Sequence, residues 1–230
     1  MADLTVSVVI PSYRDAPALA DLLPVLAQQN CEVVVVGAEP DTATATLCQR
    51  HLAKYLHAEP CRGAQLDAGA ANCSGRIIWF LHADARPPAR AVAQIQAAVA
   101  RGATAGFFSF QFAGTATLGK RMLASAINLR VALGGIPYGD QGLFTTRSAY
   151  AAAGGFRHTP LFEEVQLVKQ LRRQGRMVRL ASPMSISTRR WERDGWWRRS
   201  LHNRWLAIRF ILGASPEKLA KIYTRPDRAD

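Results

Sequence analysis

The carboxylate of Asp84 stands just after a short apolar run, residues 77–81, and before the Pro87-Pro88 pair. Such a run is typical of a buried parallel strand, and open α/β folds hold their ligands at the carboxyl ends of these strands. A carboxylate there could hold a divalent cation against a diphosphate leaving group. The alternative is an ordinary cap for the next helix, and the residues alone leave both open.

Two other segments carry groups that could act with that carboxylate. Arg62 opens a helix-compatible segment, where its guanidinium and the free backbone amides could clamp a pyrophosphate. Glu163 and Glu164 open another predicted helix, where one carboxylate could point into a cleft and act as a general base. Both acids would also be stabilised there by the helix dipole alone, so each segment has an ordinary structural explanation as well.

Two short loops could bind the substrates. Pro11, Ser12 and Tyr13 follow the first predicted strand, where the Tyr13 ring could stack on a base, although a plain turn is the alternative. Asp140 and Gln141 stand between two glycines, which fits either a turn or an acceptor-binding loop. The chain contains neither Gly-x-Gly-x-x-Gly nor the P-loop pattern, which argues against a dinucleotide fold and a P-loop nucleotidase.

Alternating strands and helices would bring these residues together. Strands are expected where short apolar runs occur, at residues 6–10, 33–36, 55–58 and 77–81. Helical spacing or composition predicts helices through residues 19–26, 42–52, 63–73 and 92–99. Beyond residue 103 we expect strands at 107–112, 142–146 and 177–180, and helices at 118–133 and 161–173. The pattern predicts one α/β, Rossmann-like domain with a mostly parallel sheet covered by helices on both faces.

Length and charge set the broad class of the protein. Its 230 residues, 49% of them hydrophobic, suffice for one sizeable core. The formal charge of +12 favours an anionic partner such as a nucleotide, phospholipid or nucleic acid. With no apolar stretch as long as a membrane span and no room for a signal peptide, we expect a cytoplasmic protein. Four cysteines are expected to be reduced and packed: Cys31, Cys48, Cys61 and Cys73.

Residues 189–209 hold seven arginines and four of the five tryptophans. An apolar stripe at helical spacing runs through this segment: Trp197, Leu201, Trp205, Ile208 and Leu212. We favour a helix that packs this stripe on the core. The second interpretation is an interfacial helix on anionic lipid, where a lipid-linked acceptor would be found. Binding of single-stranded nucleic acid comes third, because no RNA-binding motif accompanies the arginines.

Taken in order, these motifs resemble the family 2 glycosyltransferases, which have the nucleotide-diphospho-sugar transferase (GT-A) fold. The nearest likeness is to a bacterial subgroup that carries His-Ala-Asp, here residues 82–84, in place of Asp-x-Asp. The resemblance covers nearly the whole chain through six motifs, at residues 7–13, 62–70, 82–84, 139–142, 160–165 and 189–192.

The resemblance implies a GT-A domain over residues 1–190, with a nucleotide-binding half to about 103 and an acceptor half from about 104. A Trp/Arg-rich extension with amphipathic helices would follow at 191–230. It also implies transfer of a sugar from a nucleotide-diphospho-sugar donor to a hydroxyl acceptor, with inversion at the anomeric carbon. The acceptor could be lipid-linked and the protein peripheral on the inner face of an anionic membrane; nucleic acid is not expected as a partner.

The resemblance assigns a role to each motif residue. Glu164 would be the base, with Glu163 beside it. The nucleotide-sugar would be bound by residues Pro11, Ser12, Tyr13, Glu39, Arg62, Gln65, Asp67 and Asp84. The acceptor would be bound by Asp140, Gln141, Arg190 and Trp191. A divalent cation, Mg²⁺ or Mn²⁺, would be held by Asp84 and His82.

Three positions depart from the family pattern. Glu39 or Asp41 would have to replace the acid that recognises the nucleoside after the second strand. Asp67 stands where the family has Asn, which would bring an extra negative charge near a diphosphate, and His82 replaces the first Asp of Asp-x-Asp. Two rival functions stay open. One is a nucleotidyltransferase of the same fold, although residues 11–14 are not its Gly-rich loop; the other is a non-catalytic basic module that binds membrane or nucleic acid through residues 189–212.

Overall fold

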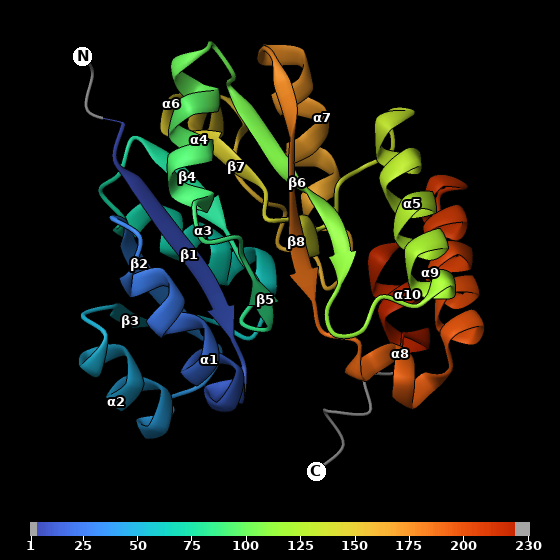
Figure 1. Ribbon diagram of the computed structural model, residues 1–230, viewed down its shortest axis with the longest axis horizontal. Coiled ribbons are helices and arrows are strands. Elements are labelled where there is room, and N and C mark those ends of the chain that lie inside the picture. Colours follow the sequence, from blue (N-terminus) through green and yellow to red (C-terminus); the bar gives the residue numbers. More distant parts are fainter. Residues whose placement is uncertain (1–3, 224–230) are drawn as a thin grey trace.

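The computed structural model describes residues 4–223 of the chain, apart from the side chain of Arg190. Its strands are β1 Val6–Ser12, β2 Glu32–Gly37, β3 Lys54–His57, β4 Ile77–Phe80, β5 Ala85–Arg86, β6 Ala105–Phe112, β7 Phe144–Thr146 and β8 Met177–Ile186. They form one sheet in the order β3-β2-β1-β4-β7-β6-β8-β5 (Figure 1). The pairs among β1 to β4 and the β6–β8 pair are parallel, whereas β7 and β5 pair antiparallel with their neighbours.

Helices cover both faces of this sheet. One face is covered by α1 Ala16–Ala27, α2 Thr42–Arg50, α4 Ala91–Ala100 and α5 Leu118–Ala132. The other is covered by α3 Arg62–Asn72, α6 Arg147–Ala153 and α7 Glu164–Gln174. The single α/β domain with its mostly parallel, helix-flanked sheet is therefore confirmed. The four cysteines are free thiols, as predicted.

The central strand β1 shows why the apolar runs predict this layering. Successive side chains of a strand point to opposite faces of the sheet. Val8 and Ile10 accordingly belong to the core cluster beneath α1, whereas Val9 belongs to the cluster beneath α3. All seven residues of β1 are buried. Because both faces of the strand are covered, its sequence does not alternate between apolar and polar residues.

Several element boundaries differ from those predicted. β1 continues through Pro11 and Ser12. The pairing of β1 with β4 ends at Val9, so no hydrogen bond to β4 is lost at Pro11, which has no N–H. The helix predicted from residue 161 begins only at Glu164, since Phe162 has a left-handed backbone with φ of 60°. β8 runs to Ile186 instead of 180, past a register shift opposite residues 108 and 109. The short elements β5 and α6 were not predicted.

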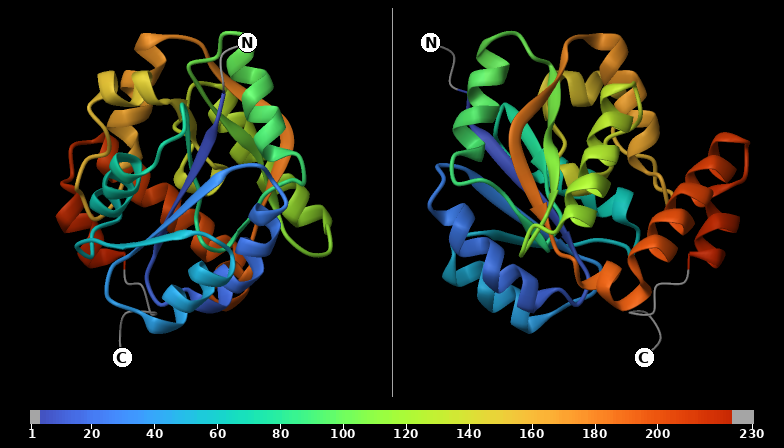
Figure 2. Two further views of the ribbon diagram at one scale, coloured as in Figure 1. Left: turned by 90° about the vertical axis from the view of Figure 1, so that its left-hand side faces the viewer. Right: turned by 45° about the vertical axis from the view of Figure 1, so that its right-hand side comes forward.

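Three further helices follow β8: α8 Arg189–Asp194, α9 Trp196–Ile211 and α10 Pro216–Ile222. They lie on the far side of the molecule from α2 and β3 (Figure 1). Lys120, near the start of α5, reaches Glu192 of α8 and lies over the ring of Trp196 at the start of α9 (Figure 2). Trp191 and Trp196 each pack edge-on against Phe112 of β6, with ring centroids 5.0 Å apart. No helix in the described range is long and apolar enough to span a bilayer. The division into residues 1–190 and 191–230 stays a prediction, and residues 224–230 lie outside the described range.

The favoured expectation for the apolar stripe of α9 is wrong. Its five side chains are between 41% and 77% exposed, although the core was expected to cover them. The helix is held by its opposite face instead, where Leu206 is buried and Phe210 stacks on Phe162 with ring centroids 4.5 Å apart. Because α9 has apolar groups on two faces, the periodicity of one face did not reveal which would pack inward.

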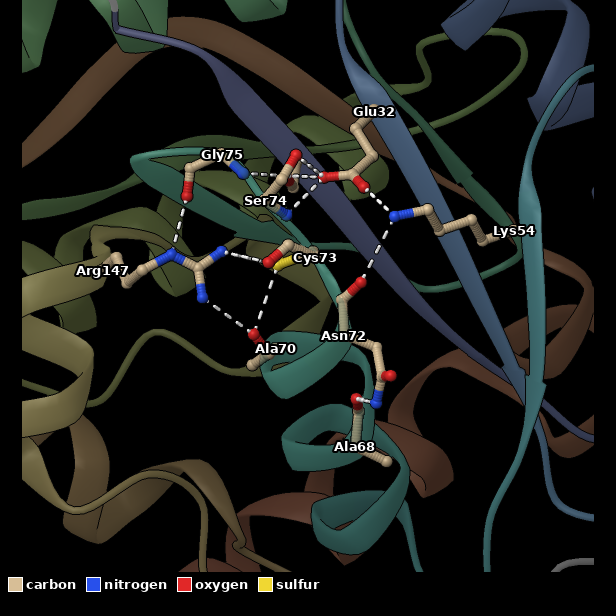
Figure 3. A network of polar contacts seen from close by, with 10 residues as sticks. Glu32, Lys54, Ala68, Ala70, Asn72, Cys73, Ser74, Gly75 and Arg147 are labelled. Carbon is tan, nitrogen blue, oxygen red and sulfur yellow. Dashed lines mark hydrogen bonds and ion pairs between the residues drawn. The ribbon is translucent and has the colours of Figure 1, made fainter.

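A polar network joins the two halves of the molecule at the amino ends of the strands (Figure 3). The guanidinium of Arg147, at the start of α6, donates to the carbonyls of Ala70, Cys73 and Gly75 at 3.1, 2.6 and 2.9 Å. The Ala70 carbonyl belongs to the last turn of α3, where helices leave acceptors without partners, and the other two carbonyls follow it. Arg147 therefore closes α3 and ties it to the start of α6.

Candidate functional site

Two cavities share a wall at the carboxyl edge of the sheet. The large cavity, about 1240 Å³, lies where β1 and β4 end, and its lining includes Tyr13, Gln65 and Asp84. The small cavity, about 190 Å³, lies between η1 (Gly139–Gln141), the start of α7 and the inner face of α9. Five residues line both: Arg62, Asp84, Leu161, Ser187 and Tyr223. The acids at 84 and 164, eighty positions apart in sequence, thus face one small cavity.

The large cavity is built on the carboxyl ends of β1 and β2. Gln65 of α3 donates to the carbonyls of Ser12 and Val36 at 3.0 and 2.7 Å, which holds these strand ends together. Pro11, Ser12 and Tyr13, the residues predicted to form a nucleotide-binding loop, line the cavity beside it.

The charge of the large cavity suits an anionic ligand. Five basic side chains line it: Arg14, Arg62, Arg86, Arg189 and Lys221. Three acidic ones face them, namely Asp15, Asp21 and Asp84. A cavity with this excess of positive charge attracts phosphate groups.

The small cavity has the opposite charge. Glu163, Glu164, Asp84 and Asp140 line it, against the two guanidinium groups of Arg62 and Arg199. Burial, helped by the charge of Asp84, raises the pKa of Asp140 to about 6, even though Arg130 acts in the opposite direction. Anions would be repelled here, whereas neutral hydroxyl groups would find several acceptors.

The two glutamates at the start of α7 are held in different ways. Phe162 adopts its left-handed backbone just before them, and such strained residues cluster at functional sites. Glu163 forms an ion pair with Arg62 at 3.4 Å. Glu164 instead accepts a hydrogen bond from the Gly139 amide at 2.9 Å. Burial and, next, the charge of Glu163 raise the pKa of Glu164 well above that of an ordinary carboxyl.

Both residues predicted to hold a metal line the small cavity. Asp84 lines both cavities, whereas His82 lines only the small one. The imidazole packs so closely on Gly139 that a Cβ there would stand 2.5 Å from Nε2 of His82. Among the described residues no three His, Cys, Asp or Glu side chains gather as a cage for a metal. A single carboxylate beside room for a diphosphate nevertheless fits Mg²⁺ or Mn²⁺, which take substrate phosphates as ligands.

Several predicted residues do not reach either cavity. Asp67 accepts hydrogen bonds from the Tyr150 hydroxyl and the Phe156 amide, and lies 2.8 Å from Nε2 of His158. It is His158, rather than Asp67, that lines the large cavity. The extra negative charge of Asp67 is therefore placed against the segment that follows α6.

The other predicted residues divide similarly. Glu39 pairs with Arg14 at 3.0 Å, whereas Asp41 caps α2 by accepting from the Ala43 amide. Gln141 is completely buried and donates to the Phe108 carbonyl at 3.2 Å, so it fastens η1 to β6. Trp191 lines the small cavity as predicted. The Arg190 side chain lies outside the described part of the chain.

Sequence reasoning missed the contribution of α9 to the small cavity. Arg199, Asn203 and Leu206 line it from one face of that helix. The Arg199 side chain is 10% exposed, donates to Asp194 and Tyr223, and keeps a buried Nε without a hydrogen-bond partner. The spacing of these residues, four and then three, places them on one face of a helix. The opposite face is more apolar and was therefore predicted to pack inward.

The family model for glycosyl transferase family 2 matches residues 7–164, more than half of the chain. This chain belongs to glycosyl transferase family 2. The match begins in β1, includes the Asp84 segment and ends at Glu164, so the predicted resemblance to the family is confirmed. The subgroup with His-Ala-Asp stays a prediction. No curated protein matches the chain.

Solved structures show the same fold at low sequence identity. A mannosyltransferase from Pyrobaculum calidifontis, in complex with GDP-Man and Mn²⁺, aligns with TM-score 0.60 and 18% identity over 78% of this chain and 56% of its own. TarS from S. aureus, in complex with UDP-GlcNAc, aligns with TM-score 0.63 and 12% identity over 80% of this chain and 58% of its own. Glucosyl-3-phosphoglycerate synthase from Mycobacterium tuberculosis, in complex with Mn²⁺, UDP and glucosyl-3-phosphoglycerate, aligns with TM-score 0.60 and 16% identity over 81% of this chain and 71% of its own. This chain thus spans little more than half the length of the first two.

Proposed function

We propose that this domain transfers a sugar from a nucleotide-diphospho-sugar to an acceptor hydroxyl, with inversion at the anomeric carbon. The observation that carries the proposal is the junction of a basic and an acidic cavity at Arg62 and Asp84. An anionic donor fits the basic side and an uncharged hydroxyl fits the acidic side. The anomeric carbon would then lie at the shared wall, close to the glutamates at the start of α7.

Glu164 acts as the general base. Its raised pKa means that it binds a proton more strongly than an ordinary carboxylate, which suits removal of a proton from a hydroxyl as that oxygen attacks. The new bond joins the acceptor oxygen to the anomeric carbon on the face opposite the leaving group. The bond from that carbon to the phosphate oxygen breaks, and its electron pair leaves with the nucleoside diphosphate. The Gly139 amide keeps the carboxylate in place.

The departing diphosphate needs positive charge at the shared wall. Asp84 would hold a divalent cation, which supplies Lewis-acid stabilisation of the leaving oxygen. The mannosyltransferase and the phosphoglycerate synthase were both solved with Mn²⁺, which supports this assignment. Arg62 adds a second positive group, held toward the cavity by its ion pair with Glu163. His82, which packs closely on Gly139, would orient that loop.

The nucleoside occupies the large cavity beyond the diphosphate. The Tyr13 ring provides a stacking surface at the end of β1, with Pro11 and Ser12 along the same wall. Two predicted residues act through partners that line the cavity. Glu39 positions Arg14, and Asp67 positions His158.

The acceptor enters the small cavity between η1 and α9. Asp140 and Trp191 line its path, while Gln141 supports the loop from below. Four carboxylates there disfavour an acceptor that is charged near its reactive hydroxyl. A polyol or sugar at the end of a lipid carrier would satisfy this requirement.

The test is Glu164→Gln, which keeps an acceptor for the Gly139 amide but removes the base. Transfer should fall by about 10²–10⁴-fold, as expected for loss of general-base catalysis. Affinity for the donor should stay within a factor of three or so of wild type, since the donor lies in the other cavity. A panel of nucleotide sugars with Mn²⁺, assayed by mass analysis of products, measures transfer. The shift in melting temperature as the donor is titrated measures its affinity.

Glu59→Gln, at an exposed glutamate outside both cavities, is the matched control and should behave like wild type. Transfer by Glu164→Gln near the wild-type rate would contradict the assignment of the base. A product that retains the donor's anomeric configuration, read by NMR, would contradict direct displacement.

A further inference from the structure

Helix α9 has two faces with different roles. Its inner face repeats at helical spacing through Arg199, Asn203, Leu206 and Phe210. The first three line the small cavity, and Phe210 stacks on Phe162, the residue before the two glutamates. The orientation of α9 about its own axis is therefore determined by contacts with the site itself.

The outer face of α9 is apolar and uncovered. It consists of Trp197, Leu201, Trp205, Ile208 and Leu212, the residues of the predicted stripe. Ten of the thirteen exposed large hydrophobic side chains in the described range belong to α5, to α9 and to the residue that ends each helix. Six of these ten belong to α9 and to Leu212, which ends it. Such a concentration on one helix marks an interaction surface rather than scattered exposure.

Basic side chains accompany this outer face. Arg198, Arg204 and Arg209 are exposed, and no acidic residue occurs between Gly195 and Ala214. No carboxylate among the described residues lies within ion-pair distance of these three arginines. The Arg209 guanidinium lies over the Trp205 ring, 5.3 Å from its centroid. Tryptophan beside arginine on one helix face is the composition that suits the headgroup region of a bilayer.

The charge pattern favours a bilayer over a second copy of the chain. A two-fold dimer through this face would bring the same surface of each subunit together. The arginines of one copy would then face those of the other with no acid on either helix to compensate. Anionic headgroups supply the missing negative charge.

We propose that the outer face of α9 docks on an anionic phospholipid bilayer and that the acceptor is a hydroxyl compound carried by a lipid in that bilayer. The second part rests on the proposed function, because it identifies the substrate class of the small cavity. The same helix forms the wall of that cavity and the contact with lipid, so an acceptor headgroup at the membrane surface is presented to Glu164 directly. Docking also holds Phe162, through Phe210, in the conformation that places the glutamates.

Vesicle flotation with the full chain, without donor, tests the docking. The protein should float with vesicles of phosphatidylcholine mixed with phosphatidylglycerol, and only weakly with phosphatidylcholine alone. Arg198→Gln, Arg204→Gln and Arg209→Gln combined should weaken binding about a hundredfold, since each basic group near an anionic surface contributes about fivefold. High salt should weaken binding of the wild type similarly.

The apolar part of the contact is tested with Leu201→Glu and Ile208→Glu combined. Binding should be lost, while circular dichroism stays that of wild type because both side chains are exposed. Leu52→Glu is the matched control, since Leu52 is 95% exposed and lies between α2 and β3, far from α9. It should bind like wild type.

Three results would overturn the docking: no binding to anionic vesicles, binding that the α9 variants leave unchanged, or a dimer seen by light scattering that Leu201→Glu dissociates. Donor hydrolysis in the absence of vesicles separates the two proposals. If vesicle binding fails but hydrolysis depends on Glu164, only the docking is wrong. If the α9 variants lose binding but Glu164→Gln transfers like wild type, the mechanism fails and the docking stands.

Discussion

Helices α1 and α9 look alike as sequences but have different surroundings in the fold. Both carry large apolar residues at helical spacing. In α1 that stripe, Leu19, Leu22, Leu23 and Leu26, is at most 2% exposed because it lies on the sheet. In α9 the stripe is exposed, and the less apolar face packs inward. Periodicity thus identifies a face of a helix, whereas the rest of the chain decides what covers it.

Two carboxylates, half-buried Glu32 and buried Glu164, differ in a similar way. Burial alone would raise the pKa of Glu32, but hydrogen bonds from Lys54, Ser7 and Ser74 outweigh it and lower the pKa to about 2. Glu164 has backbone amides as donors, but burial and the charge of Glu163 outweigh them and raise its pKa. A carboxylate whose ionised form is satisfied by donors contributes to stability, whereas one left short of donors retains reactivity.

The largest expected contrast between the two regions is in core stability. Leu23→Ala in α1 should lower the free energy of unfolding by about 2–5 kcal/mol, because it leaves a cavity in a packed core. Leu201→Ala in α9 should change it by no more than about 0.5 kcal/mol, as for other exposed sites. Urea unfolding followed by circular dichroism measures both. Similar losses for the two variants would mean that the outer face of α9 is covered in solution.

The next prediction concerns the contact between Arg147 and the end of α3. Arg147→Ala removes three hydrogen bonds to carbonyls at and after the last turn of α3 and should lower the free energy of unfolding by about 1–3 kcal/mol. Arg147→Lys should recover only part of this, since an ammonium group lacks the planar fork. Arg76→Ala, at an exposed arginine nearby, is the control and should be close to neutral. A neutral result for Arg147→Ala in urea unfolding would show that water replaces the guanidinium.

The Glu32 network predicts a loss of stability in acid. The pKa of Glu32 in the folded state is about 2, below its ordinary value of 4.5. The stability it contributes is therefore present above pH 4.5 and is lost as the pH falls toward 2. Glu32→Gln should cost about 1–2 kcal/mol at neutral pH and progressively less in acid. A difference that is constant with pH, measured by urea unfolding, would contradict the lowered pKa.

The smallest expected effect has the opposite sign and concerns Glu164. Its raised pKa means that the folded protein keeps a proton that the unfolded chain releases, so wild-type stability falls as pH rises above the ordinary carboxyl pKa. Glu164→Gln should avoid this loss and melt about 2–4 °C higher near neutral pH, with the gap closing in acid. Transfer by the wild type should rise over the same pH range, as the base ionises. A lower melting temperature for the variant would show that Glu164 is stabilising.

The part of the chain up to residue 103 was more predictable than the part after it. Its strands are continuous apolar runs, such as residues 33–36, buried on both faces and recognisable without context. β5, by contrast, has two residues and exists because β8 lies beside it. The start of α7 was misplaced because the backbone of Phe162 is set by its contacts with Tyr138 and Phe210 rather than by helix propensity.

The site shows the same division. Asp84, Arg62 and Glu164 stand in motifs whose spacing predicts them, and they do line one cavity. Asp67 and Gln141 belong to equally clear motifs, yet their side chains are held by Tyr150 and Phe108. Arg199 and His158 had no motif and were missed, although both line the cavities.

From its sequence alone, this chain could be recognised as an α/β domain of one glycosyltransferase family. The sequence also placed Asp84 after the end of a strand and Glu164 near the start of a helix. Local apolar runs and motif spacing are enough for that, because they depend on neighbours within a few residues. The tertiary structure alone decided that the two acids meet, that one cavity is basic and the other acidic, and which face of α9 is exposed. Those properties arise from contacts between residues far apart in the chain, which periodicity and composition do not record.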